Sequence, residues 1–352
     1  MIAGSKKVAA VLMCLALAPG NQAVSATGSV FMEADLVASS DPVAIEDMIS
    51  GWDGAFQPGE YAFANLTSVY GFAVNGWRFS RDRRWYYYLS FSEQTSRFFN
   101  SLEKGGGVSA GDVDLEAKSF RASGFSFGKH FEFAGGWAME PRISVYDIDR
   151  YQFGSLKGFA ESGNEESDLN ASALLDYYFD EDKILEYEDD HKNGQGVSLS
   201  LSGQVTFSPE FLLRYQLADI WNRLEFDAAT FTRGCIEFNS PANPICNAQG
   251  SASGRSGLDY YLTSIPMTVQ ARLSYQPLSI DAAVYIHEKY RRLGVGKGWD
   301  TGFGQFYVDA YSTRQLGLRW QSEWHRLTLA SDQSKASKAR DVDVNLALHW
   351  RW

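Results

Sequence analysis

The end of the chain, Asp341 to Trp352, alternates between apolar and polar side chains, which is the period of a β-strand. One face carries the apolar residues Val342, Val344, Leu346, Leu348, Trp350 and Trp352. The other face carries Asp341, Asp343, Asn345, His349 and Arg351. An apolar face beside lipid, a polar face toward a lumen and an aromatic residue at the end are typical of a transmembrane β-barrel strand. The pattern predicts that this segment closes and assembles a barrel.

The same alternation recurs along the chain, and many of the alternating segments are joined in pairs by short turns. We expect further strands at 28–40, 62–80, 84–99, 114–130, 131–148, 197–207, 211–217, 261–275, 280–286, 306–321 and 325–331. With the final strand the number comes to about 12. An even number places both termini of the chain on the periplasmic side of the membrane.

The connections between these strands alternate in length. Short turns are expected at Arg81–Arg84, Gly128–His130, Ser208–Glu210 and Gln276–Pro277. Long segments are expected at 41–60, 100–112, 152–194, 232–259, 291–305 and 332–340. A soluble β-sandwich has no reason to alternate in this way. The pattern therefore predicts an all-β fold: an antiparallel up-and-down barrel with short periplasmic turns and long extracellular loops.

The start of the chain has the pattern of a secretory signal peptide. Lys6 and Lys7 precede the apolar run Val8–Ala18, and Val24-Ser25-Ala26 offers small residues for cleavage after Ala26. The run is about 11 residues, short of the roughly 20 that a membrane-spanning helix needs. We expect residues 1–26 to be a cleaved signal and residues 27–352 to form one barrel domain.

The composition agrees with a barrel and argues against one class of binding partner. Apolar residues make up 45% of the chain and aromatic residues 14%, yet no later segment is an uninterrupted apolar stretch of helical span. Removing residues 1–26, which hold two lysines and no acid, changes the formal net charge from -11 to -13. So acidic a chain argues against nucleic acid as a partner.

Two cysteines remain after the signal, Cys235 and Cys246, separated by a segment that contains Pro241 and Pro244. Export places them in an oxidising compartment, so we expect a disulfide that closes a short loop. A metal site would need further Cys or His nearby, and the segment has none.

An acidic segment at 161–190 holds twelve Asp and Glu residues and a single base, Lys183. Such a density of carboxylates could bind the divalent cations that bridge lipopolysaccharide phosphates, or it could form a solvated loop. The spacing does not match a calcium-binding loop, so both interpretations stay open.

The phase of each strand predicts which charged residues face the lumen. The candidates are Arg214, Arg272, Asp281, His287, Lys289, Asp309, Arg319, Asp343, His349 and Arg351. Their mixed signs fit a lumen filled by ion pairs and also fit a path for solutes. The same phase places Arg314 on the lipid face of its strand.

The five histidines invite a search for a lipid hydrolase of the outer membrane, in which a Ser follows the His two residues later. The residues at that offset are Glu132, Asn193, Lys289, Leu327 and Arg351, so no catalytic residue is assigned. The glycine-rich stretch 294–304 is expected to be a flexible hairpin loop, because a phosphate-binding loop needs a following helix. The segment Pro42–Trp52 has a helical pattern.

By its signal segment, its alternating strands and its aromatic final strand, the chain resembles Gram-negative outer-membrane β-barrel proteins. The resemblance implies a place in the cell outer membrane, with lipid, lipopolysaccharide and the barrel assembly machinery as partners and with no cofactor. Its size is also similar to that of autotransporter translocator barrels, of which we would expect a solitary form without a passenger. We therefore expect a passive, porin-like channel for small solutes and no enzyme. The alternative is a structural or surface-interaction barrel of solitary autotransporter type, and a lipid hydrolase is the third hypothesis.

Overall fold

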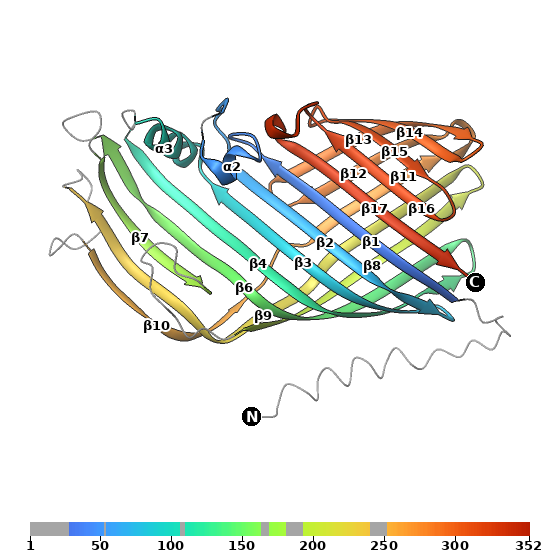
Figure 1. Ribbon diagram of the computed structural model, residues 1–352, viewed down its shortest axis with the longest axis horizontal. Helices are drawn as coiled ribbons and strands as arrows, with labels where there is room; N and C mark the ends of the chain where they lie inside the picture. The colour runs from blue at the N-terminus through green and yellow to red at the C-terminus, as the bar shows by residue number, and fades with distance from the viewer. Residues whose placement is uncertain (1–27, 53, 106–109, 163–168, 181–192, 240–251) are drawn as a thin grey trace.

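The computed structural model describes residues 28–52, 54–105, 110–162, 169–180, 193–239 and 252–352. Over these residues the chain forms one antiparallel sheet that closes on itself as a barrel (Figure 1). The expected signal, residues 1–26, lies outside the described residues. Within the described ranges, no helix has the length and apolar character to cross a membrane.

The first and last strands close the barrel. Strand β1 (Gly28–Ser40) pairs with β17 (Asp341–Arg351), from Ser29 opposite Arg351 to Ser39 opposite Asp341. Beyond that ladder, the amide of Trp352 donates to the carbonyl of Gly28 at 3.1 Å. The prediction that the final strand pairs with the first is confirmed. Gly28 and Trp352 therefore lie at the same end of the barrel, which we call the terminal end.

In the described part of the chain the barrel wall has 14 strands, so the expected number of about 12 was too low. Ten of the remaining strands are continuous: β2 (Tyr61–Val74), β3 (Trp77–Phe91), β4 (Gly111–Lys129), β6 (Trp137–Ser162), β9 (Phe211–Phe238), β12 (Ile280–His287), β13 (Tyr290–Thr301), β14 (Gly304–Tyr311), β15 (Leu316–Gln321) and β16 (His325–Ser331). Two wall positions are each built from two segments. These are β7 (Leu169–Phe179) with β8 (Gly194–Ser208), and β10 (Ala252–Thr263) with β11 (Thr268–Tyr275). A short strand, β5 (Phe131–Phe133), pairs with the start of β6.

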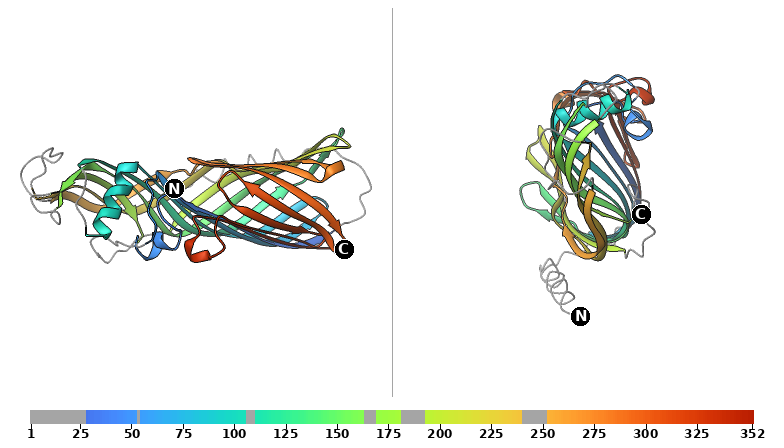
Figure 2. Two further views of the ribbon diagram at one scale, coloured as in Figure 1. Left: turned by 90° about the horizontal axis from the view of Figure 1, so that it is seen from above. Right: turned by 90° about the vertical axis from the view of Figure 1, so that its left-hand side faces the viewer.

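The height of the wall is uneven. Strands β6 and β9 have 26 and 28 residues, whereas β15 and β16 have 6 and 7. Figures 1 and 2 show β6, β7, β9 and β10 extending well beyond the short strands β12–β16. We call this extension the tall wall.

The tall wall explains why two segments expected to be long loops, 152–194 and 232–259, contain strands. Above the lipid, a strand meets water on its outer face and needs no apolar residues there. Arg121 and Asp149, for example, form an ion pair of 2.6 Å on the outer face, and both are nearly half exposed. The apolar alternation therefore disappears while the strand pairing continues.

The hairpin between β2 and β3 also differs from expectation. The turn is Asn75-Gly76, with φ of 51° and 76°, and not Arg81–Arg84, which lies in the middle of β3. Asn-Gly is the preferred sequence of a type I′ hairpin turn. The expected strand at 84–99 ends at Phe91, because Ser92 caps helix α3 (Glu93–Glu103) by accepting a hydrogen bond from the Thr95 amide.

The segment 291–305, expected to be a loop, is strand. Its glycines Gly294, Gly296 and Gly298 alternate along one face of β13. A Cβ atom on Gly296 would lie 1.9 Å from the Asp309 carboxylate, and one on Gly298 would lie 2.4 Å from the Tyr307 ring. The glycines therefore make room for large side chains of β14, and they do not provide flexibility.

The expected alternation of short and long connections fails on the short side of the barrel. Residues Glu288–Lys289 join β12 to β13, and residues 312–315 join β14 to β15. The second of these turns contains Arg314 at φ 64°, so Arg314 is a turn residue and does not lie on the lipid face of a strand. The helix expected within Pro42–Trp52 is the short α2 (Asp47–Ser50), and single 3₁₀ turns lie at Gln276–Leu278 and Ala336–Lys338.

The outer surface is apolar where the barrel is closed. Outward side chains of β13 and β15, such as Leu293, Val295 and Leu316, are each more than 60% exposed. Trp350 and Trp352 stand exposed at the terminal end. Such a surface would be unstable in water and matches the apolar band with an aromatic girdle that a membrane-spanning barrel presents to lipid.

Candidate functional site

A cavity of about 720 Å³ lies inside the barrel mouth, at the end opposite the chain termini. Its lining comes from β3, β4, β6, β7, β10 and the β12–β13 turn. We call this cavity the vestibule. The terminal end carries short turns, such as Asn75-Gly76, and the vestibule lies at the other end.

Charges of both signs line the vestibule, and most are paired. Lys289 lies 3.5 Å from Glu60, and Lys118 lies 3.0 Å from Glu116. Asp176 pairs at 3.0 Å with Arg233. The predicted lumen residue Lys289 thus lies at the vestibule, in the β12–β13 turn. Paired charges of both signs create no strong preference for anions or cations.

The connection between β1 and β2 borders this mouth and is held in part by the Asp41 side chain. Its carboxylate accepts a hydrogen bond of 3.3 Å from the Glu60 amide. Burial raises the pKa of the Asp41 carboxyl, and the hydrogen bond from the Glu60 backbone partly offsets this rise.

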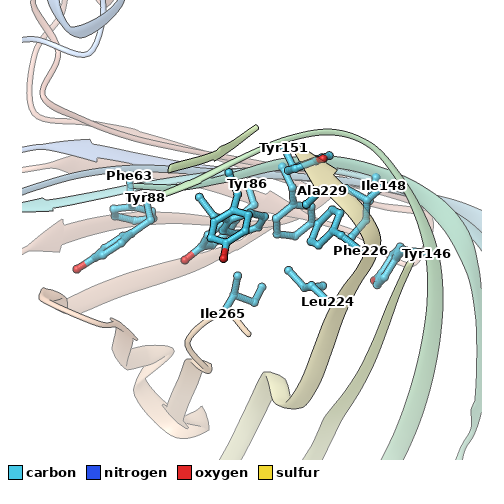
Figure 3. Packing of buried hydrophobic residues seen from close by; sticks show 14 of the residues in the cluster. Phe63, Tyr86, Tyr88, Tyr146, Ile148, Tyr151, Leu224, Phe226, Ala229 and Ile265 are labelled. Atoms are coloured by element: carbon cyan, nitrogen blue, oxygen red, sulfur yellow. The ribbon is translucent and has the colours of Figure 1, made fainter. Parts of the chain in front are cut away.

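Below the vestibule the lumen is crossed by a cluster of buried, mainly aromatic side chains, which we call the aromatic layer (Figure 3). Its members include Phe63, Tyr86, Tyr88, Phe120, Tyr151, Phe153, Tyr178, Phe226, Phe231, Tyr285 and Tyr290. Ring centroids are close: 4.8 Å for Phe63 and Tyr290, and 4.3 Å for Tyr151 and Phe226. Phe153 and Tyr178 also line the vestibule, so the two regions are continuous.

His287, a predicted lumen residue, lies in this layer and is only 1% exposed. Its Nε2 lies 3.1 Å from the Tyr86 hydroxyl, and its Nδ1 lies 2.9 Å from the Thr268 hydroxyl. The rings of Phe63, Tyr86 and Tyr88 surround it. Both ring nitrogens are thereby engaged, which satisfies a buried polar group.

Buried ion pairs fill the lumen on the terminal side of the aromatic layer. Along β3, which rises from the terminal end, Arg84 precedes Tyr86 and Tyr88. The Arg84 guanidinium binds both oxygens of Asp219, at 2.8 and 2.7 Å, and the Ser198 hydroxyl also donates to Asp219. A bidentate pair of this kind satisfies charges that burial would otherwise make costly.

Two further ion-pair groups contain five of the predicted lumen residues. Arg319 donates to Asp281 and lies 3.3 Å from Asp309, while Arg272 lies 3.3 Å from Asp281. Asp343 pairs with Arg292 in a separate contact. Sequence reasoning missed Arg84, Asp219 and Arg292, because it placed Arg84 in a turn and Arg292 in a loop.

The remaining predicted lumen residues are Arg214, His349 and Arg351. Arg214 on β9 stands opposite Arg272 on β11. His349 lies 3.5 Å from Glu33 and stacks on Phe31. Arg351 is exposed at the barrel end, where it pairs in register with Ser29. The structure does not bring these three residues into one site.

The wall is interrupted between β10 and β11, beside the aromatic layer. The side chain of Asn222 donates to the Ile265 carbonyl and accepts from the Ile265 amide, both at 2.8 Å. These bonds replace strand pairing at the interruption and direct Ile265, 5% exposed, into the aromatic layer. Figure 3 shows Ile265 beneath the row of aromatic side chains.

A Ser–His contact does occur, although not at the offset searched for. The Ser322 hydroxyl lies 2.8 Å from Nδ1 of His325, and Ser322 also accepts from the amides of Trp324 and His325. Among the described residues, Nε2 of His325 is buried with no hydrogen-bond partner. The contacts of Ser322 are those of a side chain that shapes the β15–β16 turn.

The expected disulfide and cation site fall largely outside the described residues. Cys235 lies on β9, but Cys246 is outside the described residues, so the disulfide stays a prediction. Of the acidic segment 161–190, residues 163–168 and 181–190 are also outside. In the described part, Asp180 pairs at 3.0 Å with Arg150, and no group of three or more His, Cys, Asp or Glu side chains is arranged to hold a metal ion.

No model of a known protein family matches the chain, and no curated protein is similar to it. Solved structures do show similarity. The toluene transporter TodX of Pseudomonas putida has a TM-score of 0.37 at 9% identity, with 94% of this chain and 90% of that chain covered. An outer membrane channel of Pseudomonas putida F1 has a TM-score of 0.26 at 8% identity, with 96% and 100% covered. The outer membrane protease OmpT of Escherichia coli has a TM-score of 0.22 at 8% identity, with 95% and 99% covered. With TM-scores below 0.5, the function of this chain has to follow from its own geometry.

Proposed function

We propose that the protein is a passive channel of the outer membrane for small solutes, and that it favours solutes with an aromatic or apolar body. The observation that carries the proposal is the continuity of the vestibule with the aromatic layer through Phe153 and Tyr178. An aromatic solute that enters the vestibule can stack on these rings or pack against them edge to face.

The way in which the lumen is closed supports passive transport. The members of the aromatic layer lie on the strands of the wall, apart from Ile265 in the β10–β11 interruption. Side chains of this kind change rotamer far faster than a folded plug domain could leave. A solute can therefore pass by displacing side chains while the barrel stays intact.

The ion pairs below the aromatic layer support a channel without charge selectivity. Arg84 with Asp219, and Arg292 with Asp343, place opposite charges side by side. Selective pores instead present rings of one sign. We propose no enzymatic role, and we retain the cleaved signal and the Cys235–Cys246 disulfide as parts of the proposal.

Swelling of proteoliposomes tests this function. Phenylalanine and glucose have similar mass, and only phenylalanine carries an aromatic body. We expect the refolded protein to admit phenylalanine faster than glucose. Replacing both Phe63→Ala and Tyr86→Ala should raise both rates severalfold, because it removes two members of the aromatic layer.

Tyr87→Ala is the matched control, since Tyr87 is on the same strand as Tyr86 and faces outward, 36% exposed. Its swelling rates should equal those of the unaltered protein. If neither the protein nor the double variant admits a solute, the channel proposal fails and a closed barrel with a surface role takes its place.

A further inference from the structure

Two arginines in the middle of β3 face outward toward the membrane. Arg81 and Arg83 are exposed, while Asp82 and Arg84 between and after them are buried in the lumen. Among the described residues, neither Arg81 nor Arg83 has a carboxylate within ion-pairing distance; Arg81 has only the Phe125 ring, 5.3 Å from its guanidinium. Two cations thus stand side by side on the outer surface.

Two other outward arginines are paired within the protein, whereas Arg291 on β13, like Arg81 and Arg83, has no ion pair among the described residues. Arg121 on β4 pairs with Asp149 at 2.6 Å, and Arg223 on β9 pairs with Glu225 at 3.0 Å. The first pair joins β4 to β6, and the second lies on β9 in the tall wall. The contrast indicates that the partner of Arg81 and Arg83 is not supplied by the protein.

The register of the sheet places the two arginines at the edge of the apolar band. Two residues before Arg81, toward the terminal end, Phe79 lies opposite Phe72 and Phe127. Arg81 lies opposite Tyr70 and Phe125, and Arg83 lies opposite Ser68 and Ser123. Two residues after Arg83, away from the terminal end, Trp85 lies opposite Arg121 of the exposed ion pair. The arginines therefore stand where lipid tails give way to headgroups of the outer leaflet.

The chemistry of this position favours a phosphate group. A guanidinium near lipid is costly unless an anion accompanies it, and its fork of donors matches phosphate oxygens in bidentate fashion. Residues two apart on one strand face stand roughly 7 Å apart, so both can reach one headgroup. The hydroxyls of Ser68 and Ser123 lie beside Arg83, while Phe79 and Phe125 offer an apolar surface to an acyl chain.

We propose that Arg81 and Arg83 form a binding site for a phosphate-bearing lipid of the outer leaflet, and specifically for the phosphorylated glucosamine of lipopolysaccharide. The site lies on the outside of the barrel and is independent of any transport through the lumen. The serine neighbours of the arginines would face the sugar headgroup of such a lipid, and the aromatic neighbours would face its acyl chains.

Binding of lipid A to the full-length refolded protein in detergent tests the site, with the quenching of tryptophan fluorescence as readout. We expect saturable binding of phosphorylated lipid A. The double variant Arg81→Gln and Arg83→Gln should bind at least about tenfold more weakly, which corresponds to the loss of a charge-assisted hydrogen bond. Lipid A stripped of its phosphates should bind the unaltered protein as weakly as intact lipid A binds the variant.

The double variant Arg121→Gln and Arg223→Gln is the control, because it removes the same charge from the same outer face but above the lipid boundary. It should bind phosphorylated lipid A like the unaltered protein. Heat-modifiable migration on a gel verifies that each variant is folded. Equal binding by the Arg81/Arg83 variant, equal loss in the control variant, or equal binding of the dephosphorylated lipid would each overturn the proposal.

Discussion

Single residues in the lumen show how the barrel tolerates buried charge. Arg84 and Asp219 lie in the interior, where both terminal nitrogens of Arg84 bind the Asp219 carboxylate, while Nε of Arg84 has no partner among the described residues. Removing one partner of a buried pair leaves the other charged and unpaired, which costs far more than the pair itself contributes. The Arg84–Asp219 pair is therefore expected to matter for the stability of the barrel.

Asp219→Asn should lower the free energy of unfolding by about 3–5 kcal/mol, because it leaves the Arg84 guanidinium without a counter-charge. Asn also tolerates the φ of 58° at this position, so the backbone is not an additional cause. Asp149→Asn, in the exposed pair with Arg121, should cost less than about 1 kcal/mol. Unfolding by urea in lipid measures both, and similar losses would contradict the account.

At the scale of elements, the pairing of β13 with β14 depends on the alternating glycines of β13. Gly296 is needed because Asp309 occupies the space that its Cβ would fill. Since Asp309 also contacts Arg319, the glycine allows the ion-pair group to fit within the narrow lumen.

Gly296→Ala should therefore lower the free energy of unfolding by about 1–3 kcal/mol, the usual cost of overpacking a filled interior. Gly302→Ala is the control, because its Cβ would meet no atom within 4 Å. The control should stay within about 0.5 kcal/mol of the unaltered protein. A harmless Gly296→Ala, measured in the same urea titration, would show that β13 has free space.

The sequence predicted best the strands in which apolar and polar positions alternate over the full length, and it missed strands in which one face breaks that pattern. Strands β1, β16 and β17 were expected within one residue of their bounds, because lipid requires an apolar residue at every second position. The tall wall lacks that requirement on its outer face. In β13, which does face lipid, the glycines of the inner face made the segment look like a flexible loop. Arg84, Asp219 and Arg292 were missed because a lumen partner depends on the register between strands distant in sequence.

At the scale of the whole molecule, the barrel combines a short, lipid-facing side with a tall wall that stands in water. The vestibule lies where these two heights meet, at the β12–β13 turn, and the aromatic layer forms its floor. Below it, ion pairs span the lumen. The protein is thus closed by side chains of its own wall, which is the property from which passive transport was inferred.

Single-channel recording in planar bilayers tests that inference most directly. The refolded protein should give discrete conductance steps, and the variant with Phe63→Ala and Tyr86→Ala should give larger ones, because the aromatic layer is the constriction. Tyr87→Ala should leave the step size unchanged. Barrels that show heat-modifiable migration but give no conductance step, either unaltered or with the aromatic layer opened, would contradict the account.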